Sequence, residues 1–415
     1  MPSFDVLPLF RPGASRPRAA RPLAALGLAA AASFVVAACG GGSDGGAASP
    51  PPPPPPVTTA GTYADGPISG FGSVIVNGVR FDDSVASVTD DEGRRLASDD
   101  LRLGMEVEIE AGDDQGGRAT AERVHVHSAI VGPVEDVDTP NRMLTVLGQA
   151  VSVSAATVVD DSLPGGIAGL AAGTVVRVYG PVDATGRTHA TRLESGGSPA
   201  SFRVVGVLAA LDAAAHTLQV GAALVDTGGL ATLPAGLAVG DRVLAVLDPS
   251  PVAGTWHATA LVRAERHFQD DHGEAHIHGT VTSFTSATVF DVDGIPVDAA
   301  HAAFPDGQAG LAVGAVVEVE GRQVGGTLVA TSVHLEDERH GLGEDVELHG
   351  TLSDLDPATL TFALRGSVVS YASPSLTFVG GDASQLADGA SIEVKGDLAA
   401  DGRTVVATSI HFEDD

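Results

Sequence analysis

Histidine and carboxylate side chains are concentrated in two segments of this 415-residue chain. The segments 267–278 and 334–349 hold seven of the fourteen histidines, together with several aspartates and glutamates. Imidazole nitrogen and carboxylate oxygen are ligands that divalent ions such as Zn²⁺, Ni²⁺ and Cu²⁺ accept. The sequence therefore predicts these candidate metal ligands: His267, His272, His276, His278, His334, His340 and His349.

The spacing of these histidines leaves two interpretations open. His276 and His278 are two residues apart, as are His125 and His127, so on a strand each pair would point to one face. None of the spacings matches a compact zinc motif such as His-Glu-x-x-His, however. The histidines are therefore either ligands of a divalent metal or solvated residues of acidic linkers, and no other cofactor is predicted.

Signatures of catalysis are missing from the sequence. It contains no P-loop and no dinucleotide-binding glycine fingerprint after a strand, and its Gly-x-Ser-x-Gly match at 41–45 lies in the predicted Gly/Pro-rich tether and not at the end of a strand, as the nucleophile elbow requires. Paired carboxylates are too frequent in so acidic a chain to indicate acid and base roles. We expect a protein that is not an enzyme, and an active site formed between domains is the alternative.

One phrase, Leu-x-x-Gly-x-x-apolar-x-apolar, returns five times and indicates a tandem repeat. Its glycines are Gly104, Gly173, Gly240, Gly314 and Gly389. A glycine followed by alternating apolar residues precedes each phrase, and an Ala-x-x-apolar motif follows it. Each copy spans about 60 to 75 residues, which suits a small domain and is too long for one rung of a solenoid.

These landmarks predict the following division of the chain. The expected parts are a signal peptide at 1–38, a Gly/Pro-rich tether at 39–65, and five β-domains at 66–128, 129–197, 203–267, 275–338 and 346–415. We call the five domains repeats 1 to 5. Polar segments at the domain boundaries are the expected sites of proteolysis.

The local pattern within each repeat predicts strands. Apolar and polar residues alternate, and the pairs Asn77-Gly78 and Asp293-Gly294 are typical of hairpin turns. About five short strands in each repeat suit a small barrel of the OB or SH3-like kind, whose closure removes exposed strand edges. We therefore expect an all-β chain, in which the repeated glycine adopts a positive φ in the turn before the central strand.

The formal net charge is −30, and the chain has a single lysine, Lys395. Nucleic acid is not an expected partner, because binding it requires clustered lysine and arginine. Acidic residues gather between the repeats. We expect these acidic segments to be solvated linkers that keep the repeats apart.

The N-terminus has the pattern of a secretory signal. Arginines precede an apolar run from Leu23 to Ala38, which is too short for a lasting transmembrane anchor. Cys39, the only cysteine, follows this run, so intramolecular disulfides and thiolate metal sites are excluded. Glycines and seven prolines at 50–56 come next, which suits a flexible and then stiff tether.

Two parts of the chain resemble known families. The segment 36–39, Val-Ala-Ala-Cys, resembles the lipobox of bacterial lipoproteins, which implies lipidation of Cys39; the glycine after it implies sorting to the outer membrane. The segment 66–82 together with 101–110 resembles the repeated domain of proteobacterial lipoproteins known only as a domain of unknown function. The likeness covers 66–415 and is weaker in repeats 2, 3 and 5, which lack the Gly-Phe-Gly element and the Asn-Gly turn. It implies a lipidated envelope protein with OB-like β-domains and brings no catalytic residues.

The sequence thus predicts a non-enzymatic outer-membrane lipoprotein that presents tandem β-barrel binding modules. Its lipid would anchor it to a membrane, facing the periplasm or the cell surface, and its partner would be another envelope protein or a glycan. The alternative function is an extracytoplasmic divalent-metal-binding protein that uses the junctions rich in histidine and acid.

Replacement of Cys39 by serine should release the protein into the soluble fraction, because two or more acyl chains hold a protein at a membrane stably. Mass spectrometry of the wild-type protein extracted from membranes should show a diacyl or triacyl adduct on Cys39. Wild-type protein that is soluble and carries a free thiol would contradict the lipid anchor.

Overall fold

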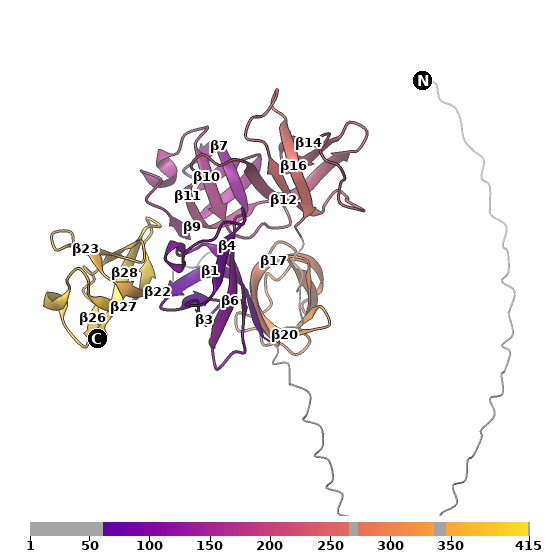
Figure 1. Ribbon diagram of the computed structural model, residues 1–415. Coiled ribbons are helices and arrows are strands. Elements are labelled where there is room, and N and C mark those ends of the chain that lie inside the picture. Colours follow the sequence, from indigo (N-terminus) through magenta and orange to yellow (C-terminus); the bar gives the residue numbers. More distant parts are fainter. Residues whose placement is uncertain (1–60, 265–272, 336–345, 414–415) are drawn as a thin grey trace, which may run out of the picture. The chain divides into compact units, whose positions relative to one another are not determined.

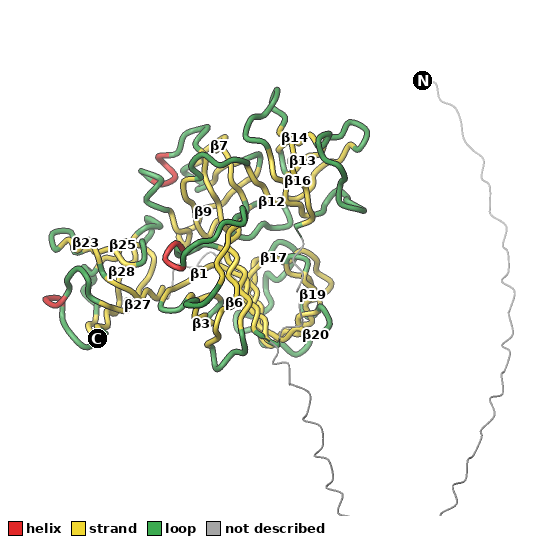
Figure 2. The backbone as a smooth tube through the Cα atoms, in the orientation of Figure 1, coloured by secondary structure: helices red, strands yellow, loops and turns green. Residues whose placement is uncertain are grey.

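All five repeats fold as β-structure, as predicted. The computed structural model describes residues 61–264, 273–335 and 346–413, and Figure 1 shows the strands along the chain. Figure 2 shows that only short helical turns interrupt them. Among the described residues, no helix is long and apolar enough to cross a membrane. The predicted signal peptide, Cys39 and nearly all of the tether lie outside the described residues.

The strands follow the repeats along the sequence. Repeat 1 contains β1 (Thr62–Phe71), β2 (Val74–Val76), β3 (Val79–Asp82), β4 (Ser87–Asp90), the 3-10 turn η1 (Ser98–Asp100), β5 (Glu106–Ala111) and β6 (Arg118–His127). Repeat 2 contains β7 (Ile130–Asp138), β8 (Met143–Val146), β9 (Gln149–Val159), η2 (Gly166–Gly169), β10 (Val175–Tyr179) and β11 (Thr188–Ser195). Repeat 3 contains β12 (Phe202–Asp212), β13 (Thr217–Val220), β14 (Ala223–Asp226), β15 (Arg242–Leu247) and β16 (Trp256–Arg263).

The last two repeats follow the same plan. Repeat 4 contains β17 (Glu274–Ser286), β18 (Val289–Val292), β19 (Ile295–Asp298), β20 (Val316–Val324) and β21 (Thr327–Leu335). Repeat 5 contains β22 (Val346–Thr351), β23 (Ser353–Asp356), β24 (Thr361–Leu364), β25 (Ser367–Ser370), β26 (Thr377–Val379), η3 (Ala383–Gln385), β27 (Ser391–Leu398) and β28 (Thr404–Phe412).

Each repeat closes into the same five-stranded barrel. In repeat 1, β1, β2 and β3 form consecutive antiparallel pairs, β3 runs parallel to β6, and β5 pairs with both β6 and β1. Repeats 2, 3 and 4 repeat this order, and in repeat 5 the adjoining strands β22 and β23 together take the place of the first strand. When the five barrel strands of one repeat are numbered along the chain, their order around the barrel is 1-2-3-5-4-1. This is the order of an OB barrel, so the repeats are of the OB kind and not of the SH3-like kind.

The repeated glycine occupies the predicted left-handed conformation in every copy. The five φ angles lie between 75° and 97°. The glycine N–H donates a hydrogen bond to a carbonyl of the first strand, from Gly104 to Ile68 at 2.9 Å and at 2.8 Å in each of the other four repeats. This turn therefore fixes the start of the fourth barrel strand against the first, and a side chain with a Cβ would strain it.

Hairpin turns connect the second and third strands of the barrels. Asn77 and Asp293 have φ angles of 49° and 50°, and the glycine after each is also positive, so both predicted turns are present. Repeats 2 and 5 lack Asn-Gly and Asp-Gly, and they use Leu147 and Arg365 in the same left-handed position before a glycine. Glycine in the second position is thus the feature these four turns share.

The repeats pair with one another through their strands, in contrast to the expectation that they are kept apart. Strand β1 of repeat 1 pairs in parallel with β17 of repeat 4, where Asp65 lies opposite Ile277, and with β22 of repeat 5, where Gly70 lies opposite Glu347. Strand β7 of repeat 2 pairs with β12 of repeat 3. Buried apolar residues follow the same connections, since one cluster joins repeats 1 and 5, another joins repeats 2 and 3, and Tyr63 of repeat 1 enters the core of repeat 4.

Arginine side chains reinforce the contacts between repeats. Each of the following arginines reaches a carboxylate or a carbonyl of a different repeat: Arg80, Arg177, Arg192, Arg203, Arg242, Arg365 and Arg403. The acidic residues at these positions are therefore partners of arginine, whereas the acidic segments at 270–271, 336–338 and 344–345, which are predicted to be linkers, lie outside the described residues. Part of the large negative charge is used to hold the repeats together.

The pair between Arg80 and Glu347 connects repeats 1 and 5. Two guanidinium nitrogens of Arg80 donate to the two carboxylate oxygens of Glu347, at 2.6 and 2.7 Å, and Lys395 lies 3.3 Å from the same carboxylate. The hydrogen bond from Arg80 is the main reason that the pKa of Glu347 is lowered, against the opposing effect of burial. The pKa of Arg80 is raised, chiefly by the same hydrogen bond.

Replacement of Arg80 by glutamine should weaken the contact between repeats 1 and 5 by about 1 kcal/mol. Because β1 pairs with β22 beside this ion pair, amide hydrogen exchange in β22 should become about fivefold faster at neutral pH. Arg123→Gln is the matched control, since Arg123 pairs with Glu110 inside repeat 1. Equal exchange in the two variants would contradict a role of Arg80 in docking.

The contribution of Glu347 should also depend on pH in a defined direction. A lowered pKa in the folded state means that the stabilisation is present above the pKa of an unfolded glutamate, about 4.3, and is lost as the pH falls through the folded value. The difference in melting temperature between wild type and Arg80→Gln should therefore be seen at pH 7 and shrink at pH 3. A difference that grows in acid would contradict this assignment.

Candidate functional site

A polar cavity of about 200 Å³ lies where repeats 1, 2 and 3 meet. The charged and polar residues that line it are Asp65, Asp91, Glu108, His125, His127, Ser128, Arg203, Arg242 and Arg263. The chain has only 23 basic residues, and three of them are arginines in this lining. The cavity thus combines guanidinium, imidazole and carboxylate groups in one small space.

The alternation of the strands explains why these side chains reach the cavity. In β6, Val124 and Val126 are 0% and 4% exposed and belong to the core of repeat 1. The histidines at 125 and 127 alternate with them and therefore project from the opposite face. In β12, Val204 is fully buried in the core, so its neighbours Arg203 and Val205 face the cavity.

Asp91 connects repeats 1 and 3 at the wall of the cavity. Its carboxylate accepts hydrogen bonds from the backbone N–H of Ser128 at 2.8 Å and from the Ser128 hydroxyl at 3.1 Å. Arg203 of repeat 3 lies 2.8 Å from the same carboxylate, and the Nε2 of His125 lies 3.5 Å away. The Asp91 side chain is only 2% exposed, so the contacts operate in a medium of low polarity.

These contacts keep Asp91 ionised. Burial raises the pKa of Asp91, but the hydrogen bond with His125, the charges of Arg203 and His127 and the hydrogen bond from Ser128 outweigh it, so that the pKa lies below its usual value. Burial lowers the pKa of Arg203, against the charges of Asp91 and Glu92. The two buried groups depend on each other, because either one alone would be an unpaired buried charge.

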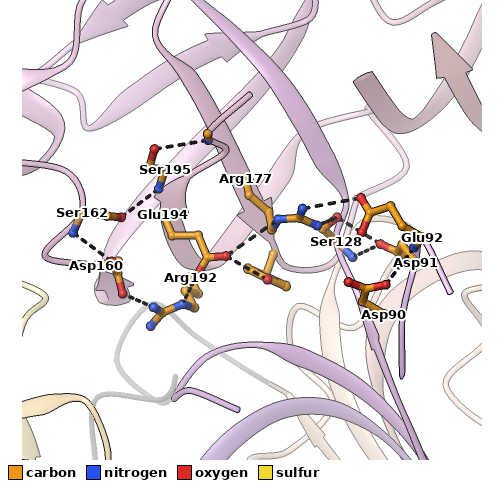
Figure 3. A network of polar contacts seen from close by, with 12 residues as sticks. Asp90, Asp91, Glu92, Ser128, Asp160, Ser162, Arg177, Arg192, Glu194 and Ser195 are labelled. Atoms are coloured by element: carbon orange, nitrogen blue, oxygen red, sulfur yellow. Dashed lines mark hydrogen bonds and ion pairs between the residues drawn. The ribbon is translucent and has the colours of Figure 1, made fainter. Parts of the chain in front are cut away.

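A network of ion pairs continues from Asp91 between repeats 1 and 2, as Figure 3 shows. Arg177 lies between Glu92 of repeat 1, at 3.5 Å, and Glu194 of repeat 2, at 3.8 Å. Arg192 then joins Glu194, at 2.8 Å, to Asp160. Arg192 is 4% exposed and also donates to the carbonyl of Leu103 in repeat 1. The network therefore fixes repeat 2 beside the cavity.

A group of possible metal ligands adjoins the cavity. Asp65, Glu106 and His127 offer ligand atoms that all lie within 4.8 Å of one another. They come from three neighbouring strands of repeat 1, β1, β5 and β6, and Glu106 lies directly opposite His127 in the antiparallel pair. Asp65 and Glu106 are 1% and 2% exposed. Oxygen and imidazole ligands of this kind suit a divalent ion.

A second group joins repeats 1 and 4. Asp114, Glu274 and His276 also have ligand atoms within 4.8 Å of one another, and all three are partly exposed. Asp114 lies in the connection between β5 and β6, where its carboxylate accepts hydrogen bonds from the N–H groups of Gly117 and Arg118. The other two residues lie at the start of β17.

The structure places the predicted metal ligands in different surroundings. His276 belongs to the second group, whereas His278 is 4% exposed and packs beside Gly66 of repeat 1. His334 lies 3.2 Å from Asp306, and His349 lies 2.5 Å from Glu413. The other three predicted ligands, His267, His272 and His340, lie outside the described residues. Among the described residues, neither group of ligand atoms contains two of the predicted histidines.

Sequence reasoning missed Asp65 and Glu106, and it noted His127 only for its spacing from His125. Asp65 directly precedes the first glycine of repeat 1, and Glu106 directly precedes Val107, the first apolar residue after the glycine of the repeated phrase. The sequence alone therefore shows where both residues stand in the repeat motif. The residues are 41 and 21 positions apart in the sequence, however, and only closure of the barrel brings them together.

Replacement of Asp91 by asparagine should destabilise the protein by about 3 kcal/mol, because it removes the carboxylate that lies 2.8 Å from the buried Arg203. Thermal unfolding measures this effect, and Asp136→Asn is the control because Asp136 is exposed. Equal melting temperatures of the two variants would show that Asp91 does not hold the repeats together.

Comparison with known families explains the repetition but gives no activity. A family described as a domain of unknown function, DUF5666, matches residues 65–125, 131–194, 278–334 and 349–411. Repeat 3 lies between the second and third matches and shares the barrel topology. No curated protein matches this chain. Since the matches cover more than half of the sequence, the chain belongs to the DUF5666 family.

Proposed function

We propose that this protein is a non-enzymatic binding protein of the cell envelope, in which packed β-barrel repeats form a binding cavity for a small polar ligand. The observation that carries the proposal is the cavity between repeats 1, 2 and 3. Each of its three arginines pairs with a carboxylate, and the further N–H donors of the guanidinium groups suit an anionic group, while the carboxylates suit a cationic one. A ligand that carries both charges would therefore match the lining.

The hydrogen bonding of the cavity supports binding in preference to catalysis. Ser128 is the hydroxyl residue in the lining, and its oxygen donates to the Asp91 carboxylate. A serine nucleophile is activated by a base that can accept its proton, usually an imidazole, whereas Asp91 is a weak base because its pKa lies below the usual value. The ionised Asp91 holds Ser128 in place between repeats 1 and 2, so both groups have structural roles.

The location in the envelope is proposed from the N-terminal sequence. A lipid on Cys39 would attach the chain to the outer membrane, and the glycines and prolines that follow would hold the repeats away from it. The negative charge of the chain suits such a position, because it disfavours close contact with anionic headgroups. Another envelope protein or a glycan would then meet the outer faces of the repeats.

Divalent-metal binding at the junction of repeats 1 and 4 is the second candidate function. The specific observation in its favour is the convergence of Asp114, Glu274 and His276. The Nδ1 atom of His276 is buried and has no hydrogen-bond partner among the described residues. An ion there would connect the predicted histidine-rich segment to repeat 1.

Replacement of Val205 by tryptophan should block the cavity and abolish ligand binding. Val205 lines the cavity from β12, and Leu244 lies opposite it in β15. The full-length protein, purified from membranes in mild detergent, should carry a small polar molecule in native mass spectrometry. The Val205→Trp variant should have lost it.

Val262→Trp is the matched control, since Val262 is 49% exposed on β16 of the same repeat and receives the same change in size. This variant should retain the bound molecule. A molecule that remains in Val205→Trp, or wild-type protein that carries none, would contradict ligand binding in the cavity.

A further inference from the structure

We infer that Asp65, Glu106 and His127 form a site for one divalent transition-metal ion, with an open coordination position that faces the cavity. The inference rests on the proposed function only in taking the cavity as a place where ligands enter. It concerns a different set of residues from the histidine-rich segments that the sequence singles out.

The chemistry of the three side chains suits such an ion. Two carboxylates and one imidazole are a common ligand set for Zn²⁺, Mn²⁺, Fe²⁺ and Co²⁺, and their ligand atoms within 4.8 Å can converge on one point. Burial of two carboxylates so close together is costly unless positive charge is supplied. A divalent ion would supply such charge.

Neighbouring donors would orient the ligands. The hydroxyl of Tyr63 donates to one oxygen of Asp65 at 3.4 Å, and the hydroxyl of Thr191 donates to an oxygen of Glu106 at 3.1 Å. Hydrogen bonds of this kind fix carboxylate ligands in known metal sites. The bond from Thr191 comes from repeat 2, so the site is completed by the packing of the repeats.

The cavity provides the open position. Asp65 and His127 are part of its lining, so the cavity adjoins the point where their ligand atoms converge. Three protein ligands and an exchangeable fourth position distinguish a metal that binds another molecule from a closed structural site. The Nε of Arg242, in the lining of the same cavity, is buried and has no hydrogen-bond partner among the described residues. An anion on the metal would lie in the same cavity as this donor.

In repeats 3 and 5 the equivalent positions carry residues different from the three proposed ligands of repeat 1. Strand register places His349, Ser391 and Glu413 of repeat 5 at the positions equivalent to Asp65, Glu106 and His127. There the imidazole of His349 and the carboxylate of Glu413 contact each other directly at 2.5 Å.

In repeat 3 the equivalent residues are Val205, Arg242 and Ala264, which line the same cavity from the other repeat. One barrel position thus carries a full ligand set in repeat 1 and a cation in repeat 3. Arg242 pairs with Asp293 of repeat 4, and its Nε is the donor that remains for an anion on the metal.

The test is titration of the full-length protein, purified in detergent and stripped with a chelator, with Co²⁺ alone. One Co²⁺ should bind per chain and give the visible absorption of a site with oxygen and nitrogen ligands. Asp65→Asn, Glu106→Gln and His127→Gln should each weaken the affinity roughly tenfold or more. His189→Gln in β11 is the control, because His189 pairs with Asp183 in repeat 2 and should not affect binding.

A separate variant, His276→Gln, distinguishes the two groups of ligands. Affinity that falls in His276→Gln and is unchanged in the three variants of the proposed site would overturn the inference and assign the ion to the second group. Co²⁺ that does not bind to the wild type would overturn it as well. Neither result would affect the outcome for Val205→Trp, so failure of the metal site and failure of the proposed function can be told apart.

Oxidation of the wild-type protein avoids the risk that a buried variant does not fold. Cu²⁺ with ascorbate oxidises histidines that bind the ion, and mass spectrometry locates the products. Oxidation should be fastest at His127 and slow at His189. Oxidation that is fastest at another histidine would overturn the inference.

Discussion

The arrangement of the repeats depends on strand β1, whose backbone forms hydrogen bonds inside and outside its own barrel. Its first half pairs with β5 on one side and with β17 of repeat 4 on the other. Its second half pairs with β2 and with β22 of repeat 5. A barrel of about 60 residues buries too little apolar surface to be more than marginally stable alone. Pairing between repeats satisfies exposed strand edges and merges the small cores, so repeat 1 is the element on which the placement of repeats 4 and 5 depends.

The barrels themselves could be predicted from local sequence because their determinants are local. The alternation of Val107 and Ile109 with glutamates specifies one buried face, and the glycine before them specifies a turn that only a positive φ allows. The prediction of the hairpin turns was incomplete, and the reason also lies in the local sequence. The turn at Leu147 carries no Asn or Asp, and the required left-handed conformation was visible only in the glycine that follows it.

The candidate site could not be predicted in the same way, because its residues are brought together by contacts between repeats. Asp91, Ser128 and Arg203 are far apart in the sequence and meet only when β12 pairs with β7. Nothing in the local pattern distinguishes Asp91 from the other aspartates of an acidic chain. Histidine density drew attention to the segments around His276, whereas the buried ligand set needed the register between β5 and β6.

In this chain, the residues that specify the fold are thus different from those that form the candidate site. The glycine turn and the strand order are the same in all five copies, and they specify the barrel. The residue before the first glycine is free to vary, from Asp65 in repeat 1 to Val205 in repeat 3 and His349 in repeat 5. Because the barrel holds this residue at a fixed place beside the fourth and last strands, a substitution there changes chemistry without changing architecture. Tandem copies can thus combine unlike surfaces around a shared cavity, which a single barrel of this size could not enclose.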